Sequence, residues 1–177
     1  DPTITNGGII KECALPLIQT LTAVVNVEPG SEVKWFSDAA GTIPVTNPTL
    51  SSVGTQEYWA QSFNPTTLCE STGLTKVTLI IDDVPDFSLT GGCENGKYTI
   101  NVNPITDFTT STPTFEWTDS TGQVVSTSSS FQPTKTGNYS CEVTVNGCSK
   151  IHPFNAFNIA CDIQKGISPK GMSGDGD

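Results

Sequence analysis

The six cysteines are the clearest chemical feature of this chain, because thiols in small modules either bind metals or form disulfides. An even number of cysteines is typical of disulfide-bonded proteins from oxidising compartments. A zinc site is disfavoured, since there is no CxxC pair and His152 is the only histidine. We therefore expect six disulfide cysteines. They are Cys13, Cys69, Cys93, Cys141, Cys148 and Cys161.

Three carboxylates stand close together at Asp82, Asp83 and Asp86. Calcium prefers such hard oxygen ligands, so these residues are candidates for a calcium site. A solvated acidic linker is the plainer alternative, because no complete ligand set is visible. We expect no cofactor and no metal beyond this one candidate.

Motifs for catalysis are missing from the sequence. The chain contains no G-x-S-x-G, no P-loop and no H-E-x-x-H. His152 has no carboxylate near it in sequence, which favours a surface or edge position. The chain has eighteen Asp and Glu residues, so their number alone does not exclude a catalytic pair of carboxylates like that of a glycosidase. However, the sequence has no insertion that would form a cleft around such a pair. We expect a protein that is not an enzyme.

Trp59 is the one aromatic residue that we single out as a candidate ligand-binding residue. It follows Tyr58, and because side chains alternate along a strand the two should face opposite ways. An outward Trp59 would suit stacking against a ligand. Edge packing and a contact with a neighbouring domain are the alternatives.

An internal repeat places these residues in two copies of one module. Five landmarks recur in the same order at offsets of 79 to 82 residues. They are Cys13, Trp35, Gly41, Tyr58 and Cys69, followed by Cys93, Trp117, Gly122, Tyr139 and Cys148. The repeat predicts one domain over residues 1–83 and a second over 84–161, which leaves residues 162–177 as a linker or the start of a truncated C-terminal domain. Pro85 in the acidic stretch favours a short extended connection between the domains.

Short β-branched stretches with period-two alternation predict an all-β protein. They cover residues 21–27, 32–36, 76–81, 97–102 and 139–145, with turn residues between them. A Trp in an early strand with a Tyr opening a later one is typical of an immunoglobulin-like β-sandwich. We therefore expect two tandem sandwiches, with Trp35, Trp117, Tyr58 and Tyr139 in their cores.

The repeat also suggests how the cysteines pair. Cys13 would bond to Cys69, and by position Cys93 would bond to Cys148, which leaves Cys141 with Cys161. In strict immunoglobulin topology, however, Cys93 with Cys141 is the better bridge between sheets, leaving Cys148 with Cys161. Four cysteines allow three connectivities, so both sets stay open.

Charge and hydropathy exclude several partners. The net charge is −10 and arginine is absent, so no face can replace the counterions of a nucleic acid. The sequence contains no stretch of 18 apolar residues, so we expect no membrane insertion. The N-terminus has no signal-peptide pattern. We expect a monomer.

The segment from Cys161 to Pro169 resembles the opening of the gliding-motility-associated C-terminal domain of Bacteroidota surface proteins. The family pattern C-x-I-x-x-G-I-S-P is matched at Cys161, Ile163, Gly166, Ile167, Ser168 and Pro169. The match breaks at Lys170, where the family has Asn, and residues 171–173 intervene before the Gly-Asp turn. The first module is similar, more loosely, to repeats that precede such a tail, with Phe36 and Trp59 in place of tyrosines.

This resemblance implies a protein exported by the type IX secretion system and held outside the outer membrane. The implied function is a non-catalytic stalk of a cell-surface adhesin, linked to gliding motility or adhesion, with the secretion machinery as partner. The alternatives are a module that binds extracellular polysaccharide, another surface or a protein, and an accessory segment of a secreted polysaccharide-degrading enzyme.

Overall fold

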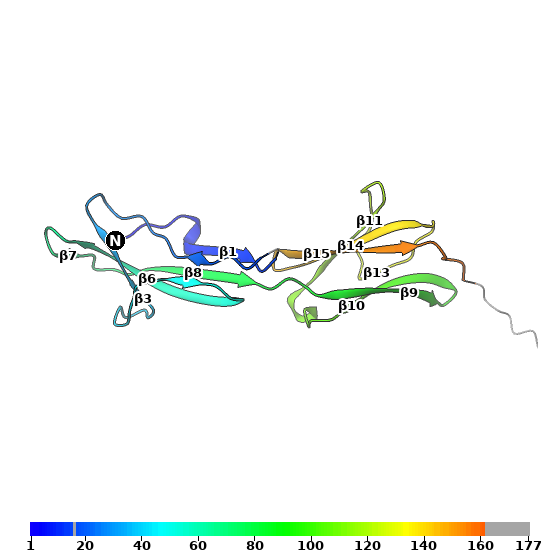
Figure 1. Cartoon of the computed structure of the whole chain (residues 1–177), viewed down its shortest axis with the longest axis horizontal. Coiled ribbons are helices and arrows are strands. Elements are labelled where there is room, and N and C mark those ends of the chain that lie inside the picture. Colours follow the sequence, from blue (N-terminus) through cyan, green and yellow to red (C-terminus); the bar gives the residue numbers. More distant parts are fainter. Residues whose placement is uncertain (16, 162–177) are drawn as a thin grey trace, which may run out of the picture. The chain divides into compact units, whose positions relative to one another are not determined.

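The computed structural model describes residues 1–15 and 17–161, and this part of the chain is all-β (Figure 1). Its helical elements are two 3-10 turns, η1 (Asn6–Gly8) and η2 (Thr109–Ser111). No helix in these residues is long and apolar enough to cross a membrane. The predicted linker at 162–177, with most of the tail resemblance, lies outside the described residues.

The chain folds into two compact units. Among the described residues, the first comprises Asp1–Val84 together with Asn146–Cys148, and the second comprises Pro85–Val145 and residues 149–161. Four residues, 83–86, separate the last strand of the first unit from the next strand along the chain.

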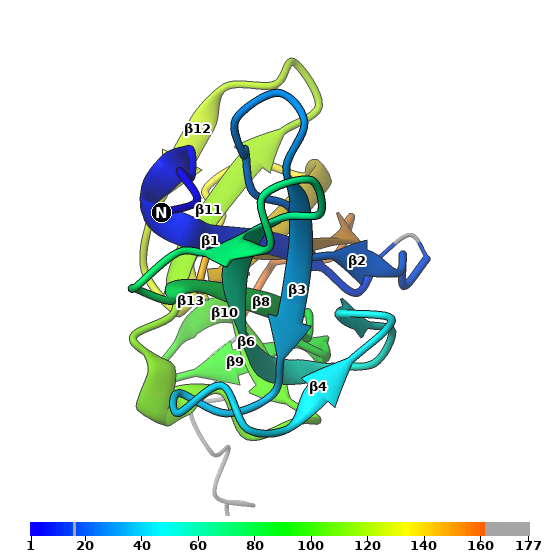
Figure 2. The same ribbon diagram turned by 90° about the vertical axis from the view of Figure 1, so that its left-hand side faces the viewer.

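The first unit contains eight strands. They are β1 (Ile9–Cys13), β2 (Leu21–Thr22), β3 (Glu32–Phe36), β4 (Pro44–Val45), β5 (Thr49–Leu50), β6 (Gly54–Asn64), β7 (Cys69–Glu70) and β8 (Thr75–Asp82). The larger sheet has the order β1-β8-β6-β3-β4, with β7 added to β6, and the short β4 pairs antiparallel with β3 (Figure 2). β1 pairs parallel to β8, whereas β2 and β5 form a second, two-stranded sheet.

Alternation in β8 shows why these residues form a sandwich. Val77, Leu79 and Ile81 are each at most 1% exposed, while the residues between them face outward. The three side chains pack with Leu21 and Tyr58 in the core of the first unit.

The second unit contains seven strands. They are β9 (Phe87–Glu94), β10 (Lys97–Pro104), β11 (Thr114–Asp119), β12 (Val124–Ser126), β13 (Ser130–Phe131), β14 (Gly137–Val145) and β15 (Cys148–Ala156). One sheet has the order β13-β10-β9 and the other β12-β11-β14-β15. The first, second and fifth strands of this unit (β9, β10 and β13) thus form one sheet, and the other four strands form the second sheet. This is the connectivity of an immunoglobulin-like sandwich.

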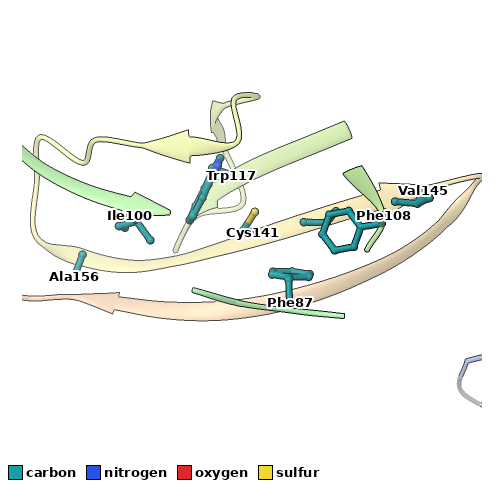
Figure 3. Close-up of a cluster of buried hydrophobic side chains, with 8 residues drawn as sticks. Phe87, Ile100, Phe108, Trp117, Cys141, Val145 and Ala156 are labelled. Atoms are coloured by element: carbon teal, nitrogen blue, oxygen red, sulfur yellow. The ribbon is translucent and has the colours of Figure 1, made fainter. Parts of the chain in front are cut away.

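Trp117 lies at the centre of the second core (Figure 3). It is fully buried beside Cys141, and its Nε1 donates a hydrogen bond to the backbone oxygen of Ser128 at 2.8 Å. Phe87, Phe108 and Ile100 complete the apolar cluster around it. A buried indole with a satisfied N–H fits the predicted core role.

The two units keep the tryptophan and tyrosine landmarks of the repeat in equivalent places. Trp35 pairs with Ala60 in the first unit as Trp117 pairs with Cys141 in the second. A tyrosine lies two residues before Ala60 and another lies two residues before Cys141. The hydroxyl of Tyr58 donates a hydrogen bond to the backbone oxygen of Thr49, and that of Tyr139 donates to the backbone oxygen of Lys135. Tyr58 and Trp117 are buried, whereas Trp35 and Tyr139 are half-buried against their cores.

Candidate functional site

The structure pairs the cysteines differently from the predicted sets. Cys13 bonds to Cys148 and Cys93 bonds to Cys161, with Cα separations of 5.6 and 5.7 Å. Cys69 and Cys141 are free thiols, the first exposed and the second fully buried. Four of the six cysteines therefore form disulfides, and both pairings predicted from sequence are wrong.

Strand register explains why Cys13 does not bond to Cys69. Cys13 lies opposite Asp82, at the end of the sheet where Gly54 of β6 pairs with Ile81. Cys69 pairs with Asn64, at the other end of β6. Ten residues of strand span roughly 30 Å at about 3.3 Å per residue, whereas a disulfide needs Cα atoms within about 7 Å.

A similar argument separates Cys93 from Cys148. The rings of Phe87 and His152 meet at 4.6 Å, which fixes β9 beside β15. Cys93 lies further along β9, toward the end where Cys161 follows β15, while Cys148 begins β15 at the opposite end. Cys141 points into the core beside Trp117, so neither predicted partner reaches it.

Burial raises the pKa of the Cys141 thiol to about 12, and the charge of Glu142 adds to this shift. The thiolate is the reactive form of cysteine, so Cys141 is chemically inert in the folded protein. It occupies the sixth-strand position that holds a disulfide cysteine in antibody domains, two residues after the tyrosine. Ala60 fills the equivalent position in the first unit.

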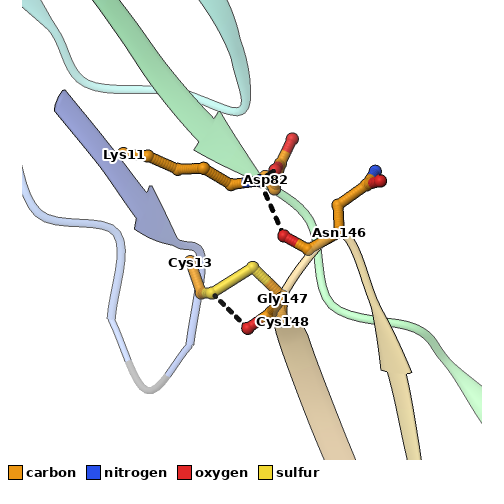
Figure 4. Close-up of polar contacts among 6 residues, drawn as sticks. All are labelled: Lys11, Cys13, Asp82, Asn146, Gly147 and Cys148. Carbon is orange, nitrogen blue, oxygen red and sulfur yellow. Dashed lines mark hydrogen bonds and ion pairs between the residues drawn. A yellow bond between two sulfur atoms is a disulfide. The ribbon is translucent and has the colours of Figure 1, made fainter. Parts of the chain in front are cut away.

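The Cys13–Cys148 bond lies within the first unit as its contacts define it (Figure 4). Lys11, two residues before Cys13, pairs with Asp82 at 2.6 Å and donates to the backbone oxygen of Asn146 at 2.6 Å. Lys11 thereby fixes the turn at 146–148 against β1 and β8. Cys148 is only 1% exposed, so one side of the bond is shielded from solvent.

The three aspartates considered for calcium each have another partner. Asp82 pairs with Lys11, Asp83 accepts a hydrogen bond from the N–H of Val84, and Asp86 pairs with Lys150. The hydrogen bond from Lys150 holds the pKa of Asp86 below its ordinary value. Within residues 1–15 and 17–161, no three acidic, histidine or cysteine side chains gather as a metal site would require.

His152 is half-buried on β15, the edge strand of its sheet, so the edge position is the one of the two predicted alternatives that it takes. Its ring meets Phe87 edge-on, and its buried Nε2 has no hydrogen-bond partner among the described residues.

A hollow of about 440 Å³ on the second unit includes Glu116 and Glu142, which stand directly opposite each other on β11 and β14. Threonines, Pro113 and Phe115 form the rest of its lining, so these carboxylates have no other charged group beside them there.

Trp59 lies on the outer face of the large sheet of the first unit. It is half-buried, while its neighbours Tyr58 and Ala60 point into the core, as alternation predicted. Phe36 and Lys76 stand directly opposite it on β3 and β8, so all three share this face. We call this surface the outer face. Its residues are Lys34, Phe36, Glu57, Trp59, Gln61, Phe63 and Lys76.

Charged side chains form ion pairs at the outer face, and one of them, Lys34, lies over an aromatic ring. The Lys34 Nζ sits 4.0 Å above the ring of Phe63 and also pairs with Glu70 at 2.5 Å. Lys76 pairs with Glu57 at 2.8 Å. Lysine stems cover apolar surface while their ammonium groups stay in water, so the rings are accessible only in part. Sequence reasoning missed Phe63, although the alternation that placed Trp59 outward places Phe63 beside it.

The equivalent face of the second unit has a different chemistry. The Phe36–Trp59 pair corresponds to Thr118–Ser140, whose hydroxyls hydrogen-bond at 2.7 Å. The Lys34–Gln61 pair corresponds to Glu116–Glu142. The two copies thus share the inward tryptophan and tyrosine and differ at these outward positions.

Comparison with known proteins concerns the fold alone. No known protein family matches the chain, and no curated protein is similar to it. An amphioxus IgVJ-C2 molecule is 15% identical, with a TM-score of 0.41, over 84% of this chain and 100% of that one. Extracellular domains 3–5 of Drosophila OTK are 17% identical, with a TM-score of 0.45, over 89% of this chain and 59% of that one. A titin I-band fragment, I67–I69, is 12% identical, with a TM-score of 0.40, over 88% and 65% of the two chains. Similarities this low carry no information about activity or partners.

Proposed function

We propose that this chain is a non-catalytic spacer of a secreted bacterial cell-surface adhesin, beside its type IX secretion signal. The observation that carries the proposal is the tandem repeat, in which two sandwiches of one kind follow each other through a connection of four residues. Repeated modules that keep their cores and vary their surfaces suit reach and display. The tail resemblance supports the secretion machinery as partner.

The disulfides support a location outside the cell, at the cell surface. Two disulfides in a chain of 177 residues are typical of an oxidising compartment, where small modules need covalent reinforcement. The net charge of −10 favours a soluble surface that repels nucleic acids and anionic membranes. The spacer would act as a monomer, without a cofactor or a metal.

A second candidate function is recognition of an extracellular polysaccharide by the outer face. The difference between the two copies favours it, because Phe36 and Trp59 replace a threonine and a serine at equivalent positions. Aromatic rings beside ammonium and amide groups suit the mixed apolar and hydroxyl surface of a sugar chain. The half-buried state of Trp59 and the position of Lys34 over the Phe63 ring limit this surface.

One experiment tests both functions. The labelled full chain is offered to a panel of polysaccharides and abiotic surfaces, beside Trp59→Ala and the matched control Ser140→Ala on the equivalent face. The spacer predicts no saturable binding by any of the three proteins. Saturable binding that is lost in Trp59→Ala and kept in Ser140→Ala would overturn the spacer and establish the outer face as a binding site.

A further inference from the structure

The two disulfides define a short covalent route through the chain. Starting at Asp1, the route reaches Cys13, crosses the sulfur bridge to Cys148 and follows β15 to Cys161. The partners of this bridge are 135 residues apart in sequence. Residues 14–147, which include most of both sandwiches, lie outside the route.

We propose that the Cys13–Cys148 bond carries tension past both sandwiches, so that pulling on the chain ends cannot draw out residues 14–147. The use of this device in a stalk rests on the proposed spacer function, whereas the route itself follows from the bonding. A covalent bond withstands forces that unfold a β-sandwich, because unfolding breaks only non-covalent contacts, whose net stabilisation of a domain is about 5 to 15 kcal/mol.

The second bond provides a reserve. From Asp1 to Cys161, the route through Cys13–Cys148 has 25 residue steps, or about 90 Å at ~3.6 Å per residue. Without that bond, the shortest route runs along the chain to Cys93 and crosses to Cys161, which gives about 330 Å on the same scale. Without either bond the full chain to Cys161 extends to about 580 Å. The two disulfides therefore set three successive limits on extension.

The surroundings of the first bond protect it from exchange. Cys148 is 1% exposed, and Lys11 ties the turn at 146–148 to β1 and β8. Disulfide exchange needs a thiolate with access to a sulfur atom. Of the two free thiols, Cys69 lies at the far end of β6 and Cys141 is buried in the other core.

Stretching single molecules tests the proposal. The full chain is held by peptide tags at its two termini and unfolded by force, and the contour length after unfolding is measured. Cys13→Ser combined with Cys148→Ser should lengthen the unfolded tether by about 240 Å, the difference between the two routes at ~3.6 Å per residue. Cys93→Ser combined with Cys161→Ser is the matched control, and it should leave the length unchanged because its bond lies off the shortest route.

Reduction of the wild-type protein by dithiothreitol in the same tether keeps the test independent of how the variants fold. The unfolded length should rise by about 490 Å on that scale. A wild-type tether that already extends by several hundred ångströms before reduction would overturn the proposal, as would equal lengthening in both double variants. Polysaccharide binding in the panel above would overturn the spacer function and leave these lengths unaltered, so the two failures are distinguishable.

Discussion

Trp117 and Trp35 are equivalent in the repeat and differ in burial. Trp117 is fully buried and donates to Ser128, whereas Trp35 is half-buried. Trp117→Ala should lower the free energy of unfolding of the second unit by about 3 to 5 kcal/mol, because it leaves a large cavity and an unpaired carbonyl. Trp35→Ala should cost the first unit distinctly less. Urea denaturation of both variants measures the difference, and equal losses would contradict the burial of Trp117.

The two free thiols should react very differently. Cys69 is exposed, whereas burial raises the pKa of Cys141 to about 12. Iodoacetamide at mildly alkaline pH should therefore label one thiol in the folded, unreduced protein, and peptide mass spectrometry should locate it at Cys69. Cys141 should label only after denaturation. Rapid labelling of Cys141 would contradict its burial, and labelling of any cysteine in the two disulfides would show that the pairing is different.

Residue types in the sequence predicted the aromatic core but not the cysteine partners. Trp117 and Tyr58 are buried as their place in the repeat suggested. Pairing depends on which ends of the strands meet in space, and the repeat contains no such information. Cys13 and Cys69 are landmarks of one module, yet they lie at opposite ends of its sheet.

Most strands were predictable because their alternation is strong. The stretches 32–36, 76–81, 97–102 and 139–145 all fall within β3, β8, β10 and β14. The stretch 21–27 forms a ladder only at Leu21–Thr22. Ala23 donates its N–H to the oxygen of Pro48, but Pro48 has no N–H to return, so the pairing with β5 ends there.

Two neighbouring glycines in β9 offer a matched test, because side chains pack against Gly91 and none packs against Gly92. A Cβ on Gly91 would lie 2.2 Å from the Tyr98 hydroxyl and 2.7 Å from the Phe154 ring, whereas a Cβ on Gly92 meets nothing within 4 Å. Gly91→Ala should lower the free energy of unfolding by about 1 to 3 kcal/mol, since both rings must move. Gly92→Ala should be neutral or slightly stabilising. Thermal melts compare them, and equal effects would contradict the cover of Gly91 by the two rings.

The turn after β11 should make the second unit sensitive to acid. The Thr121 hydroxyl and the N–H groups of Thr121 and Gln123 donate to Asp119 Oδ1. These bonds lower the pKa of Asp119 from its ordinary value of 3.8, the hydroxyl contributing most. A carboxylate with a lowered folded pKa stabilises above its unfolded pKa, and this contribution disappears as the pH falls through the folded value.

Asp119→Asn removes this titration. Its urea midpoint should therefore fall less steeply than that of the wild type as the pH drops below about 4, the ordinary carboxyl range. Parallel pH profiles for the two proteins would show that the turn contributes no acid sensitivity.

At the scale of the whole molecule, the Cys93–Cys161 bond should be the main covalent support of the second unit. It joins residues 68 apart, and closing such a loop stabilises by roughly 4 kcal/mol in the chain-entropy model. Cys93→Ser with Cys161→Ser should therefore lower the melting temperature of the second unit markedly. Differential scanning calorimetry measures this shift, and Cys69→Ser, which changes an exposed free thiol, is the control expected to melt as the wild type does.

The repeat predicted the architecture of the molecule better than its chemistry. Five landmarks at a common offset predict two copies of one fold, and the structure contains two immunoglobulin-like sandwiches, whose first strands pair differently: β1 with β8, but β9 with β10. The outward chemistry differs between the copies, because outward residues are not constrained by a core. Phe36 and Trp59 against Thr118 and Ser140 show how far such positions diverge.

The separation of 135 residues between Cys13 and Cys148 also fixes an order of events during biosynthesis. Until Cys148 has reached the oxidising compartment, Cys13 lacks its partner, and Cys69 is the other thiol within residues 1–84. Early folding of the sheet keeps these two thiols at opposite ends and so prevents a wrong bond. The Cys13–Cys148 bond can close only after both units have been exported as far as β15, so its presence marks a chain whose two units have crossed together.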